Sequence, residues 1–202
     1  MAGARLSLRT MRSRVLIRTF LQPIAVAIVL AVAVRSMVRI YAIPSASMLP
    51  TLHVGDHIVV IRDSGPEPGD VVVFHAPDAS DELMVKRIVA RAGDLVGSSN
   101  GRLTIGGHAL VEPYLAEVAA SGSIAPQIVP ANCYFVLGDN RGNSFDSRQW
   151  GVLPRERLVG RAVMVLWSSG SAGSDPPANA STVAPSPLVP GIRLERMFKR
   201  IR

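Results

Sequence analysis

One apolar run near the beginning of the chain constrains the possible folds more than any other feature. Residues 20–34 are almost wholly apolar, and only Gln22 and Pro23 interrupt them. Proline is tolerated in the first turn of a helix. A helix that spans a bilayer needs about 20 apolar residues, and further apolar residues flank the run on both sides. The pattern predicts a single-pass transmembrane helix over residues 19–40.

The arginines around this run are unevenly distributed. Those before the run outnumber those at its end, with Arg5, Arg9, Arg12, Arg14 and Arg18 on one side and Arg35 and Arg39 on the other. Segments rich in Lys and Arg stay in the cytoplasm, so we expect residues 1–18 there and the remainder on the outer face of the cell membrane. A cleaved signal peptide has a similar start, but Arg35 and Arg39 stand where small residues would prepare a cleavage site. We therefore favour an anchor in contact with membrane lipid.

The charge balance argues against a nucleic-acid partner. Lys and Arg outnumber Asp and Glu by 22 to 15, but the surplus lies largely ahead of the apolar run. A nucleic-acid-binding domain would show a basic patch with interleaved aromatic residues. The middle of this chain has balanced charge and few aromatics, so no nucleic-acid partner is expected.

Beyond the anchor, short β-branched runs alternate with turn residues. Glycine and proline pairs such as Pro68-Gly69 supply the turns. The runs are HIVVI at 57–61, VVVFH at 71–75, LMVKRIVARA at 83–92, RLTI at 102–105, YFVLG at 134–138 and AVMVLW at 162–167. This spacing predicts a mostly β domain over residues 41–167.

The remainder of the chain divides into two segments. Residues 168–191 are rich in Ser, Ala, Pro and Gly, a composition typical of a flexible loop. Residues 192–202 are basic and amphipathic, because a helix there would place the apolar residues Leu194, Met197, Phe198 and Ile201 on one face. Such a segment can lie on an anionic membrane surface or dock on the domain, and both interpretations remain open from the residues alone.

Three polar clusters are candidates for chemistry, and the first contains two serines. Ser45 and Ser47 lie within IPSASMLPTL, residues 43–52, between prolines that stiffen the backbone. In an extended segment they point the same way. One hydroxyl can then attack a carbonyl carbon while the other donates a hydrogen bond to the oxyanion. An isolated pair of this kind is more often an ordinary polar turn.

The second cluster is a lysine in an apolar, β-forming stretch. In a strand Lys86 shares a face with Met84 and Ile88, which directs its amine into apolar surroundings. Burial disfavours the ammonium and lowers the pKa of a lysine, and a lysine of lowered pKa can accept a proton from serine near neutral pH. A solvated lysine on an edge strand is the ordinary alternative.

The third cluster is GDNRGNSFDSRQWG, residues 138–151. It carries two aspartates, two arginines, two asparagines and two serines immediately after a predicted buried strand. So dense a polar set indicates a hydrogen-bonded loop at a functional site rather than a merely solvated loop.

These segments, in this order, resemble the type I signal peptidases. The resemblance covers the chain from the apolar run to about Trp167 and is carried by IPSASMLPTL, GDHIVV, GDVVVF, VKRIVARAGD and GDNRGNSFDSRQWG. It implies a coiled antiparallel β-sheet catalytic domain behind a single-pass transmembrane helix. It also implies a serine endopeptidase that cleaves signal peptides of exported preproteins after small residues in an Ala-x-Ala pattern, without a cofactor.

The resemblance assigns roles to individual residues. Ser47 is the expected nucleophile, Lys86 the general base, Ser45 an oxyanion donor and Ser144 the residue that orients the lysine amine. Two supporting ion pairs are expected around them, Asp146 with Arg148 and Asp139 with Arg87. The shallow pockets for the small substrate residues are expected at Ile43, Pro44, Met48, Leu52, Met84 and Val85.

Other functions are weighed against this one. A serine protease can use histidine and aspartate, but His57 and His75 fall on predicted strands, where a lone histidine is more often structural. The four histidines, His53, His57, His75 and His108, show no metal-ligand spacing. A self-cleaving, repressor-like Ser/Lys protein would need a soluble N-terminal regulatory domain. A catalytically inactive membrane-bound receptor for export sequences is the remaining alternative, and the presence of Ser47, Lys86 and Ser144 disfavours it.

Overall fold

The computed structural model describes residues 17–62, 65–77, 82–115, 122–169, 184–185, 196 and 198–201. The chain divides into two compact units, Met1–Arg39 and Ile40–Arg202.

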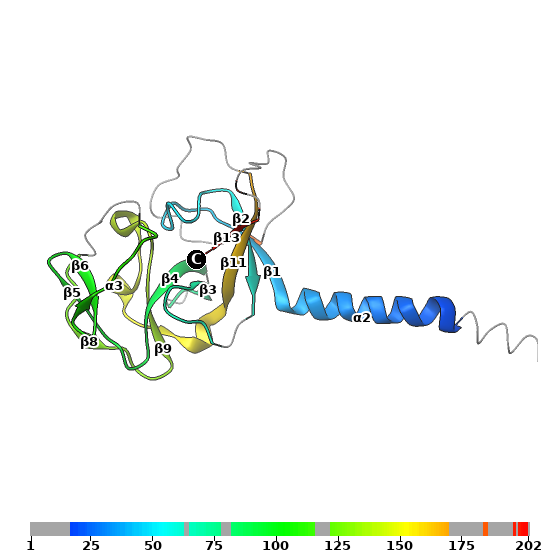
Figure 1. Ribbon diagram of the computed structural model, residues 1–202, viewed down its shortest axis with the longest axis horizontal. Coiled ribbons are helices and arrows are strands. Elements are labelled where there is room, and N and C mark those ends of the chain that lie inside the picture. Colours follow the sequence, from blue (N-terminus) through cyan, green and yellow to red (C-terminus); the bar gives the residue numbers. More distant parts are fainter. Residues whose placement is uncertain are drawn as a thin grey trace, which may run out of the picture. The chain divides into compact units, whose positions relative to one another are not determined.

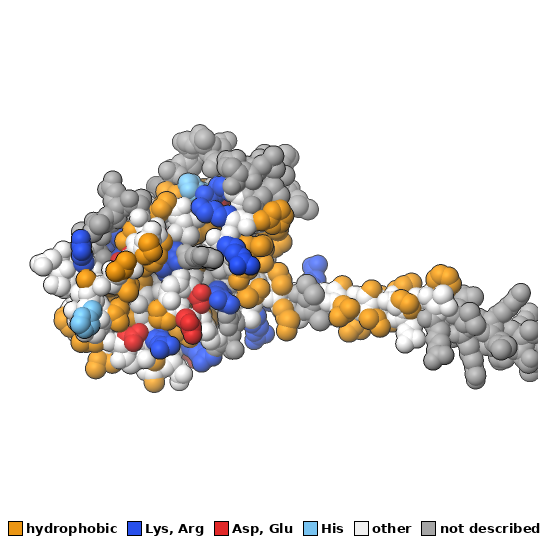
Figure 2. Space-filling view, in the orientation of Figure 1, with side chains coloured by type: hydrophobic (Ala, Val, Ile, Leu, Met, Phe, Trp, Pro, Cys, Tyr) orange, Lys and Arg blue, Asp and Glu red, His pale blue; other side chains and the backbone are white. Residues whose placement is uncertain are grey.

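The N-terminal unit is helical. A π-helical turn, η1 (Ile17–Leu21), leads directly into α2 (Gln22–Met37). The stretch Thr19–Met37 has a mean hydropathy of 1.9 and is long and apolar enough to cross a membrane. Its large apolar side chains are exposed (Figure 2), among them Ile24, Ile28 and Leu30. A helix apolar on all sides is typical of a membrane span.

The helix is slightly shorter than the anchor expected over residues 19–40. It ends at Met37, and β1 (Val38–Ala42) follows it immediately. The sequence VRIYA is rich in β-branched and aromatic residues, which favour a strand.

The second unit is built around one large antiparallel sheet (Figure 1). Among the described residues its strand order is β10-β9-β4-β3-β11-β2-β1-β12, and β13 also pairs with β11. The strands after β1 are β2 (Asp56–Ile61), β3 (Val71–His75), β4 (Leu83–Arg91), β9 (Cys133–Leu137), β10 (Leu153–Pro154), β11 (Leu158–Ser168), β12 (Ala184–Pro185) and β13 (Lys199–Arg200).

A smaller sheet lies between β4 and β9 in the chain. It contains β5 (Leu95–Ser99), β6 (Arg102–Ile105), β7 (His108–Ala109) and β8 (Gln127–Ile128) in the order β7-β6-β5-β8. Short helical turns are also present in the second unit, among them η2 (Arg141–Asn143), α3 (Ser147–Trp150) and η3 (Arg155–Arg157).

Strand β4 separates the apolar core into clusters, because its alternate residues point to opposite faces. Val85 joins one cluster with residues of β2, β3 and β11, whereas Met84 and Ile88 join another with Phe74 and Val136. A third cluster joins Val89 and other residues of β4 and β9 to the small sheet. The long, doubly paired β4 therefore carries its central residues through fully buried surroundings.

The structure confirms the predicted mostly β domain. All six predicted strands are present, two of them with the predicted bounds, Val71–His75 and Arg102–Ile105. The predicted loop at 168–191 lies outside the described residues except for 168–169 and β12, which pairs with β1.

The C-terminal segment differs from the helix considered above. Lys199 and Arg200 form a strand that pairs antiparallel with Met164 and Val165 of β11. The exposed edge of β11 supplies backbone hydrogen-bond partners that a helix would not use, and Ile201 N–H accordingly donates to the Val163 carbonyl over 3.1 Å. Leu194 and Met197 lie outside the described residues.

Candidate active site

The two serines lie on a folded loop between β1 and β2. Backbone hydrogen bonds close the base of this loop, from Ile43 N–H to the Asp56 carbonyl and from Gly55 N–H to the Ile43 carbonyl, both over 2.8 Å. A tight turn within it is held by a bond from Leu52 N–H to the Met48 carbonyl over 2.9 Å. We call residues 43–56 the serine loop.

Strand β4 places Lys86 against this loop. Lys86 lies opposite Val72 of β3 in the sheet, and the residue is 2% exposed. Its Nζ lies 2.8 Å from Ser47 Oγ, and Ser45 Oγ lies 3.2 Å from the same oxygen. Ser47 itself is 6% exposed. The fold thus brings three of the predicted residues together, although Ser47 and Lys86 are 39 positions apart.

The surroundings of Lys86 favour its neutral form. Burial lowers the pKa of its amine from 10.5 to about 8, with a smaller lowering contribution from Arg148, while the negative charges of Asp146 and Asp139 oppose the shift. Desolvation dominates because the hydration free energy that the buried ammonium loses exceeds the favourable electrostatic energy that these carboxylates supply. A substantial fraction of Lys86 is therefore unprotonated slightly above neutral pH, as a general base must be.

The adjacent residue of β4 points to the opposite face and forms a buried ion pair. The guanidinium of Arg87 donates to both Asp139 carboxylate oxygens, over 2.8 and 2.6 Å. The hydroxyl of Thr51 also donates to Asp139, so this pair connects β4 to the serine loop. The other side of the guanidinium lies 4.0 Å from the ring centre of Tyr114, a favourable cation–aromatic contact.

The second predicted ion pair organises the loop that follows β9. Arg148 donates to both Asp146 oxygens over 2.8 and 2.9 Å. Asp146 also caps α3 and accepts from the Gly138 N–H over 3.0 Å. Both expected ion pairs are thus present.

Ser144 packs against Gly138, close to Ser47. A Cβ placed on Gly138 would lie 2.2 Å from Ser144 Oγ and 2.6 Å from the Ser47 carbonyl oxygen. Only glycine fits this close approach. Ser144 Oγ is buried and, among the described residues, has no hydrogen-bond partner. Its expected bond to the Lys86 amine is not made in this structure, and the orienting role stays a prediction.

The residues expected to form substrate pockets are divided between faces of the sheet. Ile43, Met48, Leu52 and Val85 belong to one apolar cluster, Met84 belongs to another, and Pro44 is partly buried. Next to them, residues 83–86 of β4 pair with β3 on one side only, because the pairing with β9 begins at Arg87. Within the described part of the chain, no strand occupies the other side of 83–86.

Further residues of the site carry little or no signal in the sequence. Asn140 N–H donates to the Ser47 carbonyl over 3.0 Å, and its side-chain amide donates to the Ala46 carbonyl over 3.2 Å. It lies within the polar cluster 138–151, whose composition indicated a functional loop but did not single out this residue. Arg141 pairs with Glu112, which also accepts from the Tyr114 hydroxyl. Nothing in the sequence around Glu112 and Tyr114 predicts that they lie close to the polar cluster 138–151.

The histidine alternative finds no support in the contacts of Ser47. Among the described residues, the side-chain partners of Ser47 Oγ are Ser45 and Lys86. His57 is buried and stacks on Trp167 with ring centres 4.4 Å apart. No group of three His, Cys, Asp or Glu side chains in the described residues is arranged to hold a metal ion.

Comparison with known proteins gives one consistent family. Residues 16–167 match the family described as "Signal peptidase, peptidase S26". The chain is 38% identical to signal peptidase I of Leptolyngbya laminosa over 165 residues, which are 76% of this chain and 81% of that protein. It is 40% identical to a probable signal peptidase I of Synechocystis over 70% of this chain and 69% of the relative. Signal peptidase I of Bacillus amyloliquefaciens is 36% identical over 70% and 82% of the two chains.

Proposed function

The chain belongs to the signal peptidase family of serine peptidases, and from this premise we propose that it cleaves signal peptides with a Ser47/Lys86 dyad after an Ala-x-Ala sequence. The family membership gives the enzyme class and the kind of substrate. The identity of the nucleophile, of the base and of the preferred sequence are the proposal.

The observation that carries the proposal is the buried contact between Lys86 Nζ and Ser47 Oγ, 2.8 Å long. A hydroxyl is a weak nucleophile unless a base accepts its proton. The lowered pKa of Lys86, about 8, suits that task because the best catalytic pKa lies near the working pH.

The proposed reaction proceeds in two stages. Neutral Lys86 accepts the Ser47 proton while Oγ attacks the scissile carbonyl carbon, and the Lys86 ammonium then gives this proton to the leaving amine as the C–N bond breaks. An ester to Ser47 remains. Lys86, neutral again, accepts a proton from water as the water oxygen attacks the ester, and this proton returns to Ser47 Oγ.

The hydroxyl of Ser45 is proposed to stabilise the oxyanion. Its oxygen lies 3.2 Å from Ser47 Oγ, so it is close to any carbonyl that Ser47 attacks. Together with the backbone N–H of Ser47 it would supply two donors. Loss of one such donor typically costs 10²–10³-fold in kcat.

The substrate is proposed to bind as an added strand. Among the described residues, no strand pairs with residues 83–86 on the side away from β3. Strand addition there would supply main-chain hydrogen bonds that do not depend on sequence. The preference for small residues would then come from shallow pockets over Ile43, Met48 and Val85, which belong to one packed cluster.

The family and the N-terminal helix Thr19–Met37 together indicate a membrane-anchored enzyme. We propose that residues 1–18 are cytoplasmic and that the catalytic unit acts on the outer face. The excess of arginines ahead of the helix supports this orientation.

The test is cleavage of a peptide with an Ala-x-Ala site in detergent, with product masses that locate the cut. The wild type is expected to cut after the final alanine, and folded Ser47→Ala and Lys86→Ala variants to show no cleavage. A matched peptide with bulky residues in place of both alanines is expected to resist. A folded wild type that leaves every signal-sequence peptide intact would contradict the proposal and favour an inactive receptor.

A further inference from the structure

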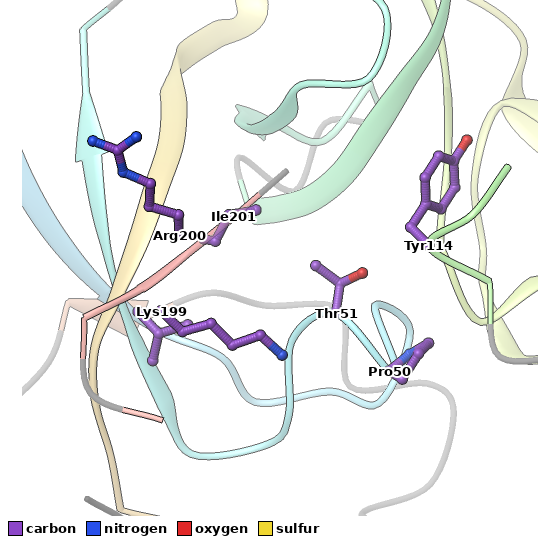
Figure 3. Close-up of a pocket in the computed structure, with 7 residues that line it drawn as sticks. Pro50, Thr51, Tyr114, Lys199, Arg200 and Ile201 are labelled. Atoms are coloured by element: carbon purple, nitrogen blue, oxygen red, sulfur yellow. The ribbon is translucent and has the colours of Figure 1, made fainter. Parts of the chain in front are cut away.

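The C-terminal segment returns to the serine loop from the far end of the chain. Strand β13 pairs with β11, and Ile201 packs against the apolar cluster that contains Met48 and Leu52. Lys199, Ile201, Thr51 and Pro50 line one cavity of 460 Å³. In Figure 3 the Lys199 side chain extends toward the segment that carries Thr51 and Pro50. The tail therefore lies beside the turn that follows Ser47.

One side chain of this segment enters the serine loop. Arg196 is only 11% exposed, and its guanidinium donates to the carboxylate of Asp56, with Nε 3.0 Å from Oδ1 and Nη2 also bonded to Oδ2. The same Nη2 donates to the Thr51 carbonyl over 3.2 Å. Arg196 thus bonds both to the base of the loop, at Asp56, and to its turn, at Thr51.

Asp56 needs such a partner because its side chain is fully buried. A buried carboxylate is costly unless it is paired and hydrogen-bonded. Besides Arg196, the donor to this carboxylate among the described residues is the His53 N–H, over 2.9 Å. The Asp56 carboxylate therefore connects the loop backbone at His53 to the Arg196 side chain.

Thr51 is held from two sides. Its hydroxyl donates to Asp139, which is paired with Arg87 of β4, and its carbonyl accepts from Arg196. One connection fixes the serine loop to the strand that carries Lys86. The other fixes it to the C-terminal segment.

We propose that Arg196 is a positioning residue, which sets the place of Ser47 relative to Lys86 by clamping the serine loop between Asp56 and Thr51. The inference rests on the proposed function, because it concerns the same nucleophile. It assigns the support of the active site to one side chain of the basic tail, Arg196.

The expected consequence is a loss in the chemical step. A displacement of about 1 Å at a nucleophile can lower the rate about 100-fold. The strand edge at 83–86, where the substrate is proposed to bind, lies on β4, whereas the hydrogen bonds of Arg196 to described residues go to Asp56 and Thr51. Loss of the clamp should therefore lower kcat the most, with only a small rise in KM, because Ile43 and Met48 of the same loop are also proposed to line the substrate pockets.

The experiment measures kcat and KM on the Ala-x-Ala peptide for the full chain in detergent. Arg196→Ala is expected to lower kcat about tenfold or more, with KM changed by less than about threefold. The kcat of Arg196→Lys is expected to lie between those of the wild type and Arg196→Ala, because an ammonium is a point charge and cannot form the forked contact of a guanidinium. Arg200→Ala removes an exposed charge of the same tail and is expected to match the wild type.

A second variant separates positioning from simple charge compensation. The double variant Asp56→Asn with Arg196→Ala removes the buried charge along with its partner, which should restore stability. It does not restore the tether to Thr51, so kcat is expected to stay low. Recovery of the wild-type kcat in the double variant would overturn the positioning role.

Hydrogen exchange tests the clamp independently of catalysis. Amides of residues 43–56 are expected to exchange faster in Arg196→Ala than in Arg200→Ala. The inference is overturned if Arg196→Ala leaves either the exchange rates or kcat unchanged. If Arg196→Ala does not fold, a wild-type kcat in Arg196→Lys would overturn the inference. A wild type without activity would refute the proposed function alone, because the exchange comparison would still decide the clamp.

Discussion

Replacement of Lys86 by methionine should stabilise the protein while it abolishes cleavage. Methionine has a similar length and no charge, so it fills the same buried site without the cost of desolvating an ammonium. The amine has a pKa of about 8 in the folded protein against 10.5 for the ordinary value. Each unit of this difference corresponds to about 1.4 kcal/mol.

Proton linkage determines how the free energy of unfolding changes with pH. Between pH 8 and 10.5 the unfolded chain binds a proton at Lys86 that the folded protein has released, so the free energy of unfolding of the wild type rises with pH across that window. Below pH 8 the full penalty applies, about 3 kcal/mol at pH 7, and it falls to about 1 kcal/mol at pH 10. The methionine variant lacks this contribution at every pH.

Urea unfolding of both proteins in the same detergent at pH 7, 8.5 and 10 measures the effect. The difference in the free energy of unfolding, variant minus wild type, is expected to decrease by about 2 kcal/mol from pH 7 to pH 10. Other titrating groups cancel because both proteins contain them. A difference that stays constant with pH would refute the reasoning, since Lys86 would then titrate alike in the folded and unfolded states.

Three further predictions concern residues around the dyad. Gly138→Ala is expected to abolish cleavage of the peptide, because its Cβ would lie 2.2 Å from Ser144 Oγ. Gly142→Ala is the control and should retain wild-type activity in the same assay, because a Cβ there meets nothing within 4 Å. Asp146→Ala removes the cap of α3 and one partner of a buried ion pair, and denaturant unfolding should show a loss of about 3 kcal/mol or more; a loss below 1 kcal/mol would refute this. His57→Phe keeps an aromatic ring in the stack and should leave kcat within about twofold of the wild type, and a loss above 100-fold would revive a histidine base.

The strands were largely predictable because their signal is local. Runs such as VVVFH at Val71–His75 combine β-branched residues with flanking turns. The strand Leu95–Ser99 carried no such signal, because Gly97 has low β propensity and Val96 is its single β-branched residue. It forms because β6 and β8 pair with it and Val96 is buried.

The active site was predictable only in part. The apolar neighbours of Lys86 predicted its burial from strand phase, but the resemblance to a family was needed to pair it with Ser47. Long-range contacts leave no trace in local patterning, and the pair of Arg196 with Asp56 joins residues 140 positions apart. The helical periodicity of the tail was also misleading, because the free edge of β11 favoured a strand there.

The most direct test of the dyad is the pH dependence of kcat/KM on the Ala-x-Ala peptide, measured from pH 5 to 10. The acid limb reports the free enzyme's essential base. If Lys86 is that base, the limb should have a midpoint near 8, the pKa set by its burial, and kcat/KM should fall about tenfold for each pH unit below it. A midpoint near 6.5, the ordinary pKa of histidine, together with cleavage that survives in Lys86→Ala, would contradict the account.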